Sequence, residues 1–388
     1  MFQIKTLNKI SPCGLQVFDP AKYAHGDDVE NPDAIMVRSA SMHEMEMPAN
    51  LKAIARAGAG TNNIPVDKCA EQGIVVFNTP GANANAVKEL VIAGLLLSSR
   101  KIVPAIEWAK TLKGKGDEVG KLVEKGKSAF AGPEIKGKSL GVIGLGAIGV
   151  MVANAASNLG MKVYGYDPYL SVDSAWNLTH NAIHALDVKE IYANCDYITI
   201  HVPLTPETKE AINAETIATM KDGVRILNFA RGDLVKTEDI LAALDSGKVA
   251  AYVTDFPNDA LIGVEGVIAI PHLGASTPES EDNCATMAAK ELVDYLENGN
   301  ITHSVNLPDA VLPRTENTTR ICVIHRNVPN ILTRITGAAA AENINIENML
   351  NKSKKDFAYT ILDVTTAVSD EAIAAVDAID DIIRIRVI

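Results

Sequence analysis

The chain has 388 residues, of which 47% are hydrophobic and 22% are charged. This length corresponds to two or three domains, and the composition is that of a globular protein. The formal net charge of −12 disfavours nucleic acids and anionic membranes as partners, because both would be repelled. The start, MFQIKTLNKI, lacks the pattern of a signal peptide, and no run of 18 apolar residues occurs, so a cytoplasmic protein is expected. The five scattered cysteines indicate neither a disulfide framework nor a thiolate metal site.

Short β-branched runs alternate with helical stretches from the amino terminus onward. Strands are predicted at 34–37, 51–57 and 73–77, and a long apolar helix is predicted from about residue 87 to residue 102. The segment 110–138 that follows is rich in lysine. It is interpreted as a solvated surface loop, although its positive charge could also serve a phosphorylated ligand.

A second series of apolar runs begins at residue 139 and continues to residue 272. It contains about six predicted strands, each followed by a turn signal or a helical stretch. Strands that alternate with helices predict parallel pairing, and six such units are what a complete dinucleotide-binding sheet requires. The expected fold class is therefore α/β with a doubly wound parallel sheet.

The pattern restarts at Arg320, after a polar stretch, SVNLPDAVLPRTENTT, that is typical of a linker. The order strand, helix, strand, strand, helix, strand over about 70 residues predicts a small ferredoxin-like domain. Such a sheet has exposed edges and one open face. Pairing of two copies is therefore expected, and with it a homo-oligomer, either a dimer or a tetramer.

A glycine-rich motif in the second series indicates a cofactor site. Gly144, Gly146 and Gly149 form GxGxxG, which follows an apolar strand and opens a helix. In that context the glycines allow a tight turn, close approach of a pyrophosphate and contact between helix and strand. Asp167 comes 18 residues later, where a carboxylate would accept hydrogen bonds from the adenosine ribose and repel a 2′-phosphate. The pattern favours NAD over NADP. The alternatives are that the glycines form an ordinary turn between strand and helix and that Asp167 is an N-cap.

Three polar residues at predicted strand ends indicate catalysis. Arg231 follows the apolar run in ILNFARGDLV, and an arginine at such a place needs an anionic partner, either a structural carboxylate or a ligand. His272 and Asp259 also follow predicted strands, and a paired imidazole and carboxylate can accept the proton of an alcohol. Alone, each could be an ordinary strand-end or turn residue. His180 and His184 lack a third ligand nearby, so no metal site is expected.

The motifs together resemble the D-isomer-specific 2-hydroxyacid dehydrogenases. GLGAIG followed by YDP, HVPLTPET at 201–208, NFARGDLV at 228–235 and PHLGAST at 271–277 occur in the order of that family. The resemblance implies that Arg231 binds the substrate carboxylate and carbonyl, that His272 is the acid and base, and that Asp259 assists it. The family usually has glutamate at the position of Asp259.

The resemblance also implies which residues line the site and how the chain divides. Further substrate-binding residues would be Arg38, Ser39, Ala59, Gly60 and Asn83. NAD would contact Gly144, Gly146, Ala147, Ile148, Gly149, Asp167, His201, Val202, Pro203, Thr208, Ala230, Asp255 and Gly274. A flavodoxin-like substrate domain would comprise 1–98 and 271–306, with the NAD-binding Rossmann domain, 99–270, inserted in it; a linker at 307–317 and a regulatory domain at 318–388 would follow.

The implied activity is NAD-dependent oxidation of 3-phospho-D-glycerate to 3-phosphohydroxypyruvate, the first step of L-serine synthesis. Alternatives are another D-2-hydroxyacid dehydrogenase, acting on lactate, glycerate or glyoxylate, and a NAD-sensing scaffold of the corepressor type. The carboxyl-terminal unit resembles an ACT domain, a module that binds amino acids between paired copies. L-Serine would then be an effector held by His325, Asn327 and Asn345; Asn330 stands where that family often has glycine.

Overall fold

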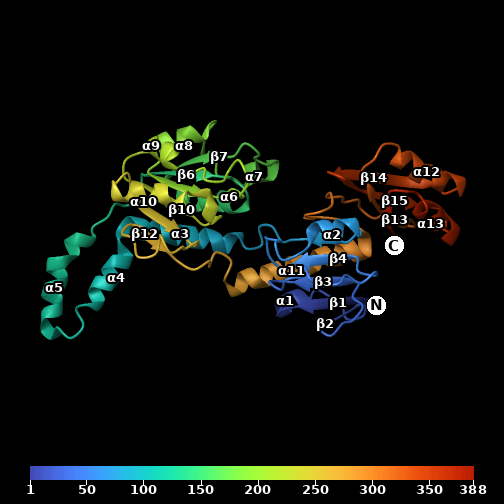
Figure 1. The fold of residues 1–388 in the computed structure, drawn as a ribbon, viewed down its shortest axis with the longest axis horizontal. Helices are drawn as coiled ribbons and strands as arrows, with labels where there is room; N and C mark the ends of the chain where they lie inside the picture. Colours follow the sequence, from blue (N-terminus) through green and yellow to red (C-terminus); the bar gives the residue numbers. More distant parts are fainter. The chain divides into compact units, whose positions relative to one another are not determined.

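The computed structural model describes residues 1–388, which divide into two compact units (Figure 1). Unit 1 comprises Met1–Asn83 and Pro278–Ile388, and unit 2 comprises Ala84–Thr277. The finer domain limits expected from the sequence stay a prediction. None of the helices combines the length and the apolar character that a membrane span requires.

The amino-terminal part of unit 1 is a parallel sheet of five strands in the order β2-β1-β3-β4-β5, which is the flavodoxin-like order. Its strands are short and apolar because both faces are covered; all four residues of β3 are buried. The elements are β1 (Phe2–Leu7), α1 (Pro12–Leu15), β2 (Tyr23–Gly26), β3 (Ala34–Val37), β4 (Ala53–Arg56), α2 (Val66–Glu71), β5 (Val75–Phe77) and the returning α11 (Pro278–Asn298).

Unit 2 is built on a parallel sheet of seven strands in the order β12-β11-β10-β9-β6-β7-β8. The expected doubly wound fold class is confirmed, and the two-residue edge strand β8 is an addition to the six expected strands. The strands are β6 (Ser139–Ile143), β7 (Lys162–Tyr166), β8 (Ile183–His184), β9 (Tyr197–Ile200), β10 (Val224–Asn228), β11 (Val249–Thr254) and β12 (Val267–Ala269). Chain order reverses between β6 and β9, and ligands of such sheets bind beyond the carboxyl ends of the strands at that point.

The helices of unit 2 cover both faces of this sheet. They are α3 (Ala84–Arg100), α6 (Ala147–Asn158), α7 (Val172–Asn177), α8 (Val188–Asn194), α9 (Ala214–Ala218), η3 (Gly232–Leu234) and α10 (Thr237–Asp245). α3 packs Val91 and Leu95 into the same core as Leu140 of β6 and Val253 of β11. The strands of this sheet are thus held by a shared core, and the loops that carry the candidate site begin at their carboxyl ends.

The lysine-rich segment, expected as a loop, is largely helical. It contains α4 (Ile102–Lys110), η1 (Gly116–Glu118), α5 (Val119–Gly126) and η2 (Lys127–Phe130), which project from the sheet of unit 2 (Figure 1). The rings of Trp108 and Phe130 lie 5.2 Å apart, and Gly126 passes beneath the indole, so the two arms of the projection pack on each other. Neither α4 nor α5 buries a residue. Their apolar residues are spaced as in amphipathic helices, but the excess of lysine favoured the interpretation as a loop.

The carboxyl-terminal part of unit 1 is an antiparallel sheet with the strand order β14-β15-β13-β16 and two helices, as expected for a ferredoxin-like domain. Its elements are β13 (Thr319–Arg326), α12 (Ile331–Ala341), β14 (Ile346–Lys354), β15 (Phe357–Val364), α13 (Asp370–Asp377) and β16 (Ile382–Val387). One sheet face, which includes Val323 and Leu362, packs with Ile335 of α12 and Val376 of α13.

The expectation that the other face of this sheet is open was wrong. Ile324 and Ile361 on that face are buried in one core with Tyr295 at the end of α11. The Tyr359 hydroxyl donates to Gly299 O at 2.7 Å, and the Arg386 guanidinium stacks on the Tyr295 ring at 4.3 Å. The strand RICVIH is apolar on both faces, which is the sequence signal for a sheet covered twice.

Candidate functional site

The glycine-rich loop of unit 2 has the geometry of a phosphate-binding turn. Gly144 adopts φ 92°, and a side chain on Gly149 would lie 1.9 Å from Gly144 O, so α6 can approach β6 this closely only without a side chain there. α6 begins after Gly146 without a side-chain cap, and the space beside Gly146 is empty. The first-turn N–H groups of Ala147 and Ile148 can therefore meet a pyrophosphate.

Asp167 lies at the carboxyl end of β7 and braces the same loop. Its Oδ2 accepts from the N–H of Leu145 at 2.8 Å, and its Oδ1 accepts from the N–H of Tyr169 at 2.8 Å. Each oxygen keeps a further lone pair for a donor such as a ribose hydroxyl. The loop and Asp167 thus fit the adenosine half of NAD.

The loop after β9 carries a second group of predicted cofactor residues. His201 bonds through Nε2 to Thr199 Oγ1 at 2.9 Å, and burial lowers the pKa of its imidazole to about 4, so the ring is neutral. The Thr208 hydroxyl donates to Pro203 O at 2.6 Å and closes the loop. Val202 is partly buried against the core of the sheet. These residues therefore form a fixed, uncharged wall beyond the strand ends.

Arg231 stands at the carboxyl end of β10 without an acidic partner. Its side chain is exposed, and its only hydrogen bond runs from Nη1 to Ala230 O at 2.6 Å. The turn that presents it is held by buried Asn228, which donates to Arg231 O at 2.8 Å and accepts from the Ala230 N–H at 3.2 Å. Of the two partners considered from the sequence, a carboxylate in an ion pair is therefore absent, and most donors of the guanidinium are free for a ligand.

His272 follows β12, and its ring contacts Phe256, with the two centroids 4.9 Å apart. Asp255, at the end of β11, is only 1% exposed and accepts from the Gly274 N–H at 3.3 Å. Burial raises the pKa of Asp255, whereas the charges of His272 and Arg231 and the Gly274 N–H act to lower it. The structure therefore gathers Arg231, His272 and Asp255 at one edge of the sheet.

Asp259 is not gathered with them. It is exposed, and its side chain makes no hydrogen bond or ion pair in the structure. The reason is the turn on which it lies: Asn258 Oδ1 accepts from the Leu261 N–H at 3.1 Å and closes a helical turn that leaves Asp259 facing solvent. Its catalytic role stays a prediction.

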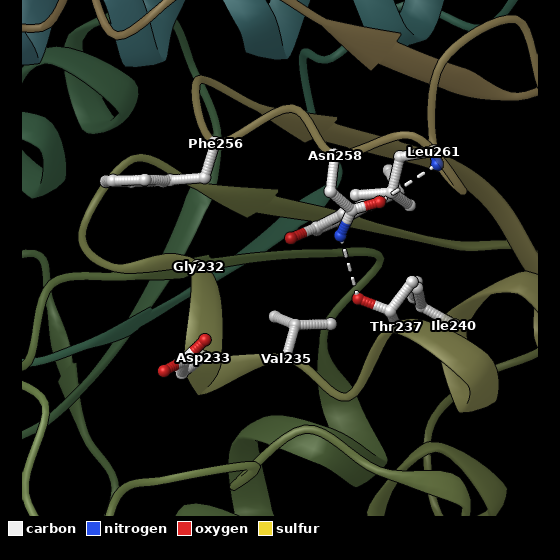
Figure 2. A pocket seen from close by; sticks show the side chains of 9 residues that line it. Gly232, Asp233, Val235, Thr237, Ile240, Phe256, Asn258 and Leu261 are labelled. Carbon is white, nitrogen blue, oxygen red and sulfur yellow. Dashed lines mark hydrogen bonds between the residues drawn. The ribbon is translucent and has the colours of Figure 1, made fainter.

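A pocket lies beside this edge, between the loops that follow β10 and β11 (Figure 2). Tyr252 and Ile240 form part of its apolar lining, and Asp233 and Asn258 contribute polar groups. Asn258 Nδ2 donates to Thr237 Oγ1 at 3.2 Å and ties the two loops together. This hydrogen bond links the segment after β10, which carries Arg231, to the segment after β11, which carries Phe256.

In unit 1 the loops after β3, β4 and β5 meet at one sheet edge. Arg38 forms an ion pair of 2.6 Å with Glu281 of α11, and the Ser39 N–H donates to Asn8 Oδ1 at 3.0 Å. Asn78 Nδ2 donates to Ala59 O at 2.5 Å and joins the second loop to the third. Gly60 continues the second loop, and Asn83 ends the third, just before α3.

Arg56 is a further candidate that the sequence analysis missed. It ends β4, is partly buried, and donates from Nε to Arg38 O at 3.1 Å, yet it has no ion pair. Burial and the neighbouring Arg38 lower the pKa of its guanidinium. A side chain on Gly58 would lie 1.7 Å from Arg56 Nη1, so the arginine lies across the glycine of the loop. The signal in the sequence was an arginine between an apolar strand and AGAG, the same pattern that drew attention to Arg231.

The predicted effector residues are spread over the carboxyl-terminal sheet. His325 is fully buried, with Nδ1 2.8 Å from Arg326 O and Nε2 2.9 Å from Thr360 Oγ1. Asn327 and Asn345 are exposed and lie beside opposite ends of β15. Asn330 adopts φ 64°, the left-handed conformation that glycine would also adopt there.

Comparisons with known proteins agree with this geometry. The family model of the D-isomer specific 2-hydroxyacid dehydrogenase NAD binding domain matches residues 92–274. A D-3-phosphoglycerate dehydrogenase of Haemophilus influenzae is 33% identical over 355 residues, which are 89% of this chain and 83% of that protein. The chain belongs to the D-isomer-specific 2-hydroxyacid dehydrogenase family. The expectation of a NAD-dependent oxidoreductase is thereby confirmed.

Other relatives of this dehydrogenase are longer than it is. The D-3-phosphoglycerate dehydrogenases of Methanocaldococcus jannaschii and Bacillus subtilis are 36% and 32% identical to it over 73% and 79% of the chain. The chain spans only 53% and 59% of their lengths. The crystal structure of a NAD+-bound 3-phosphoglycerate dehydrogenase of Entamoeba histolytica matches 79% of this chain and 98% of that one, with a TM-score of 0.60 and 26% identity.

Proposed function

We propose that this dehydrogenase oxidises 3-phospho-D-glycerate to 3-phosphohydroxypyruvate with NAD, the first step of L-serine synthesis. The observation that carries the proposal is Arg231: an exposed guanidinium without an acid, at the same sheet edge as His272. Its planar fork matches the α-carboxylate of a 2-hydroxyacid through two parallel hydrogen bonds. The relatives named D-3-phosphoglycerate dehydrogenase support this substrate over other 2-hydroxyacids.

His272 supplies the proton transfer in this proposal. Its imidazole accepts the proton of the substrate's 2-hydroxyl while the hydrogen on the same carbon leaves as hydride. NAD, when bound, accepts that hydride. The neutral ring is the form that can act as base, and an acid beside it stabilises the imidazolium that results.

Arg56 is proposed as a ligand of the substrate's phosphate. A guanidinium held partly out of water without an acid is costly unless an anion binds to it, and a phosphate offers the charge and geometry that it lacks. The rival substrates lactate and glyoxylate carry no second anionic group. An unpaired Arg56 therefore favours a phosphorylated substrate over lactate or glyoxylate. A NAD-sensing scaffold without activity would need neither Arg56 nor Arg231.

Formation of NADH with 3-phospho-D-glycerate, D-glycerate and D-lactate tests the function. We expect oxidation of the phosphorylated acid with NAD and little with NADP. Arg56→Gln should lower kcat/KM for 3-phospho-D-glycerate by about 10- to 100-fold, the effect of one hydrogen bond to a charged group, and leave that for D-glycerate nearly unchanged. Arg314→Gln removes an exposed charge from unit 1 and is the matched control. Equal losses on both substrates would contradict the role of Arg56.

A homo-oligomer is also proposed. The helices α4 and α5 bury no residue. Four apolar side chains on them are 37–50% exposed, which is typical of a surface that another chain covers: Ile102, Val103, Ile106 and Val123.

L-Serine as an effector stays a prediction. Asn327 and Asn345 lie beside opposite ends of β15, so a ligand that touches both of these residues needs a second copy of the chain. His325 could take part only after its two internal hydrogen bonds break. A cytoplasmic location stays a prediction as well.

A further inference from the structure

The guanidinium of Arg38, one of the expected substrate ligands, is paired with a carboxylate of the same unit. Its Nη2 donates to Glu281 Oε1 at 2.6 Å, and neither residue forms another ion pair. Both side chains remain in contact with solvent, with exposed fractions of 42% for Arg38 and 43% for Glu281. An ion pair exposed to water is weak and can be exchanged for another anion. A ligand can therefore separate these two groups.

The backbone that carries Arg38 is fixed, so its side chain is the part that can change partner. The N–H groups of Ser39 and Ala40 both donate to Asn8 Oδ1, at 3.0 and 2.5 Å. Asn63 Nδ2 donates to Ala40 O at 2.8 Å and holds the same loop. The guanidinium thus starts from one position at the end of β3, and rotation of its long side chain selects the anion that it meets.

Glu281 is placed beside Arg38 by the first turn of α11. The next residue, Asp282, accepts a hydrogen bond from the hydroxyl of Ser11, the residue that caps α1. Ser280, on the other side of Glu281, is buried. The turn is thus anchored on both sides of Glu281, whereas the Glu281 carboxylate itself stays at the surface.

A second cation makes this pair important for anion binding. Arg56 donates from Nε to Arg38 O at 3.1 Å and forms no ion pair. Burial lowers the pKa of the Arg56 guanidinium, and the positive charge of Arg38 lowers it further, so the two arginines repel each other. A phosphate would neutralise both cations. To bind Arg38, however, it must displace Glu281 and bind close to that negative charge.

We propose that Glu281 is an internal competitor for the anionic end of the substrate, which occupies Arg38 until a phosphate displaces it. The contact weakens the binding of every phosphate-bearing ligand. It disfavours most a small anion such as inorganic phosphate, which gains no other contacts in return. The identity of the substrate rests on the proposed function, whereas the competition requires only a phosphate group and can be measured without NAD.

Titration with inorganic phosphate, followed by phosphorus NMR on the full chain without NAD, tests the competition. Glu281→Gln should bind phosphate about two- to five-fold more tightly, which is the range of an exposed ion pair. Glu279→Gln removes an equal charge from the same helical turn, where the carboxylate is exposed and forms no ion pair, and should change the affinity much less. In steady-state rates with 3-phospho-D-glycerate, Glu281→Gln should lower KM by the same factor and leave kcat unchanged.

A double variant tests whether Arg38 carries the effect. Arg38→Gln should weaken phosphate binding, and adding Glu281→Gln to it should bring no gain. A gain of full size in that background, or in Glu279→Gln, would show a general charge effect and overturn the proposal. Phosphate binding by Glu281→Gln that is no tighter than in the unaltered protein would overturn it as well. If Glu281→Gln binds phosphate more tightly but no protein oxidises 3-phospho-D-glycerate, the competition stands and the proposed function fails.

Discussion

The carboxyl edge of the sheet in unit 2 and the interior of the carboxyl-terminal sheet use an arginine in opposite ways. Arg320 in β13 is completely buried and forms two hydrogen bonds of 2.7 Å with Asp363, which is also completely buried. Its remaining donors meet the carbonyls of Asn298, Leu312 and Pro313. Arg231 in unit 2 is exposed and donates only to a neighbouring carbonyl. The first arginine has every donor satisfied by the protein, whereas the second has most of them available to a ligand.

This difference separates stability from catalysis. The buried pair joins β13 to β15 and, through Asn298 O, to the end of α11, and it has no donor left to bind anything else. An unpaired cation at a strand end contributes little to stability and leaves donors for an anionic substrate. Substitutions in the two regions should accordingly affect different measurements.

The largest effect is expected at His272. Because the His272 side chain is exposed and its ring packs against that of Phe256 without a hydrogen bond, His272→Ala should leave the free energy of unfolding nearly unchanged. Loss of a general base should lower kcat by about 10² to 10⁴. NADH affinity should stay close to that of the unaltered enzyme. Steady-state rates and NADH fluorescence titration measure both, and a variant that turns over at the normal rate would remove His272 from the mechanism.

The next largest effect is expected at Arg320. Arg320→Met leaves Asp363 buried without a partner and should lower the free energy of unfolding by about 3–5 kcal/mol. The double variant Arg320→Met with Asp363→Leu removes both charges and should recover a large part of that loss. Urea denaturation of the three proteins gives the comparison. A single variant with unchanged stability would show that the pair does not hold the sheet.

A smaller effect is expected at Asp167, which both holds the glycine-rich loop and is expected to bind the cofactor. Asp167→Ala removes the acceptor of the Leu145 N–H and a carboxylate for the ribose, so NAD should bind about 10- to 100-fold more weakly. Binding of NADP should improve relative to NAD, because the repulsion of its 2′-phosphate is relieved. Calorimetric titration with each cofactor tests this. Equal affinity of the unaltered protein for NAD and NADP would contradict the role of Asp167.

The sequence predicted the fold best where a residue pattern is compatible with only one local structure. The alternation of apolar strands and helices gave the parallel sheet of unit 2, and the glycine spacing gave the turn before α6. The covered face of the carboxyl-terminal sheet was missed because its partner, the end of α11, lies more than 20 residues before it in the chain. The helices α4 and α5 were missed because the excess of lysine in this segment favoured a loop over the amphipathic pattern of its apolar residues.

The site was predicted in the same uneven way. Arg231 and His272 were chosen because a polar residue shortly after a buried strand is expected at the sheet edge, and each lies three residues after its strand ends. Asp259 was chosen by its place in a motif, but the turn closed by Asn258 decides where its carboxylate points, and spacing alone does not reveal that turn. Arg56 ends β4 and Asp255 directly follows β11, so their places at the sheet edges follow from the strand pattern, whereas the catalytic role of Asp259 stays a prediction.

Replacement of Arg231 by lysine, compared with Arg225→Lys in the preceding strand β10, tests the central contrast most directly. Arg225 donates to Ser98 O and lies over the Tyr197 ring at 5.3 Å, so it is a structural arginine of β10. Arg231→Lys should lower kcat/KM for 3-phospho-D-glycerate by about 10- to 100-fold, because lysine keeps the charge but loses the bidentate fork, and should leave urea denaturation unchanged. Arg225→Lys should do the reverse. An Arg231→Lys variant that is fully active, or that is inactive only because it unfolds, would contradict the account.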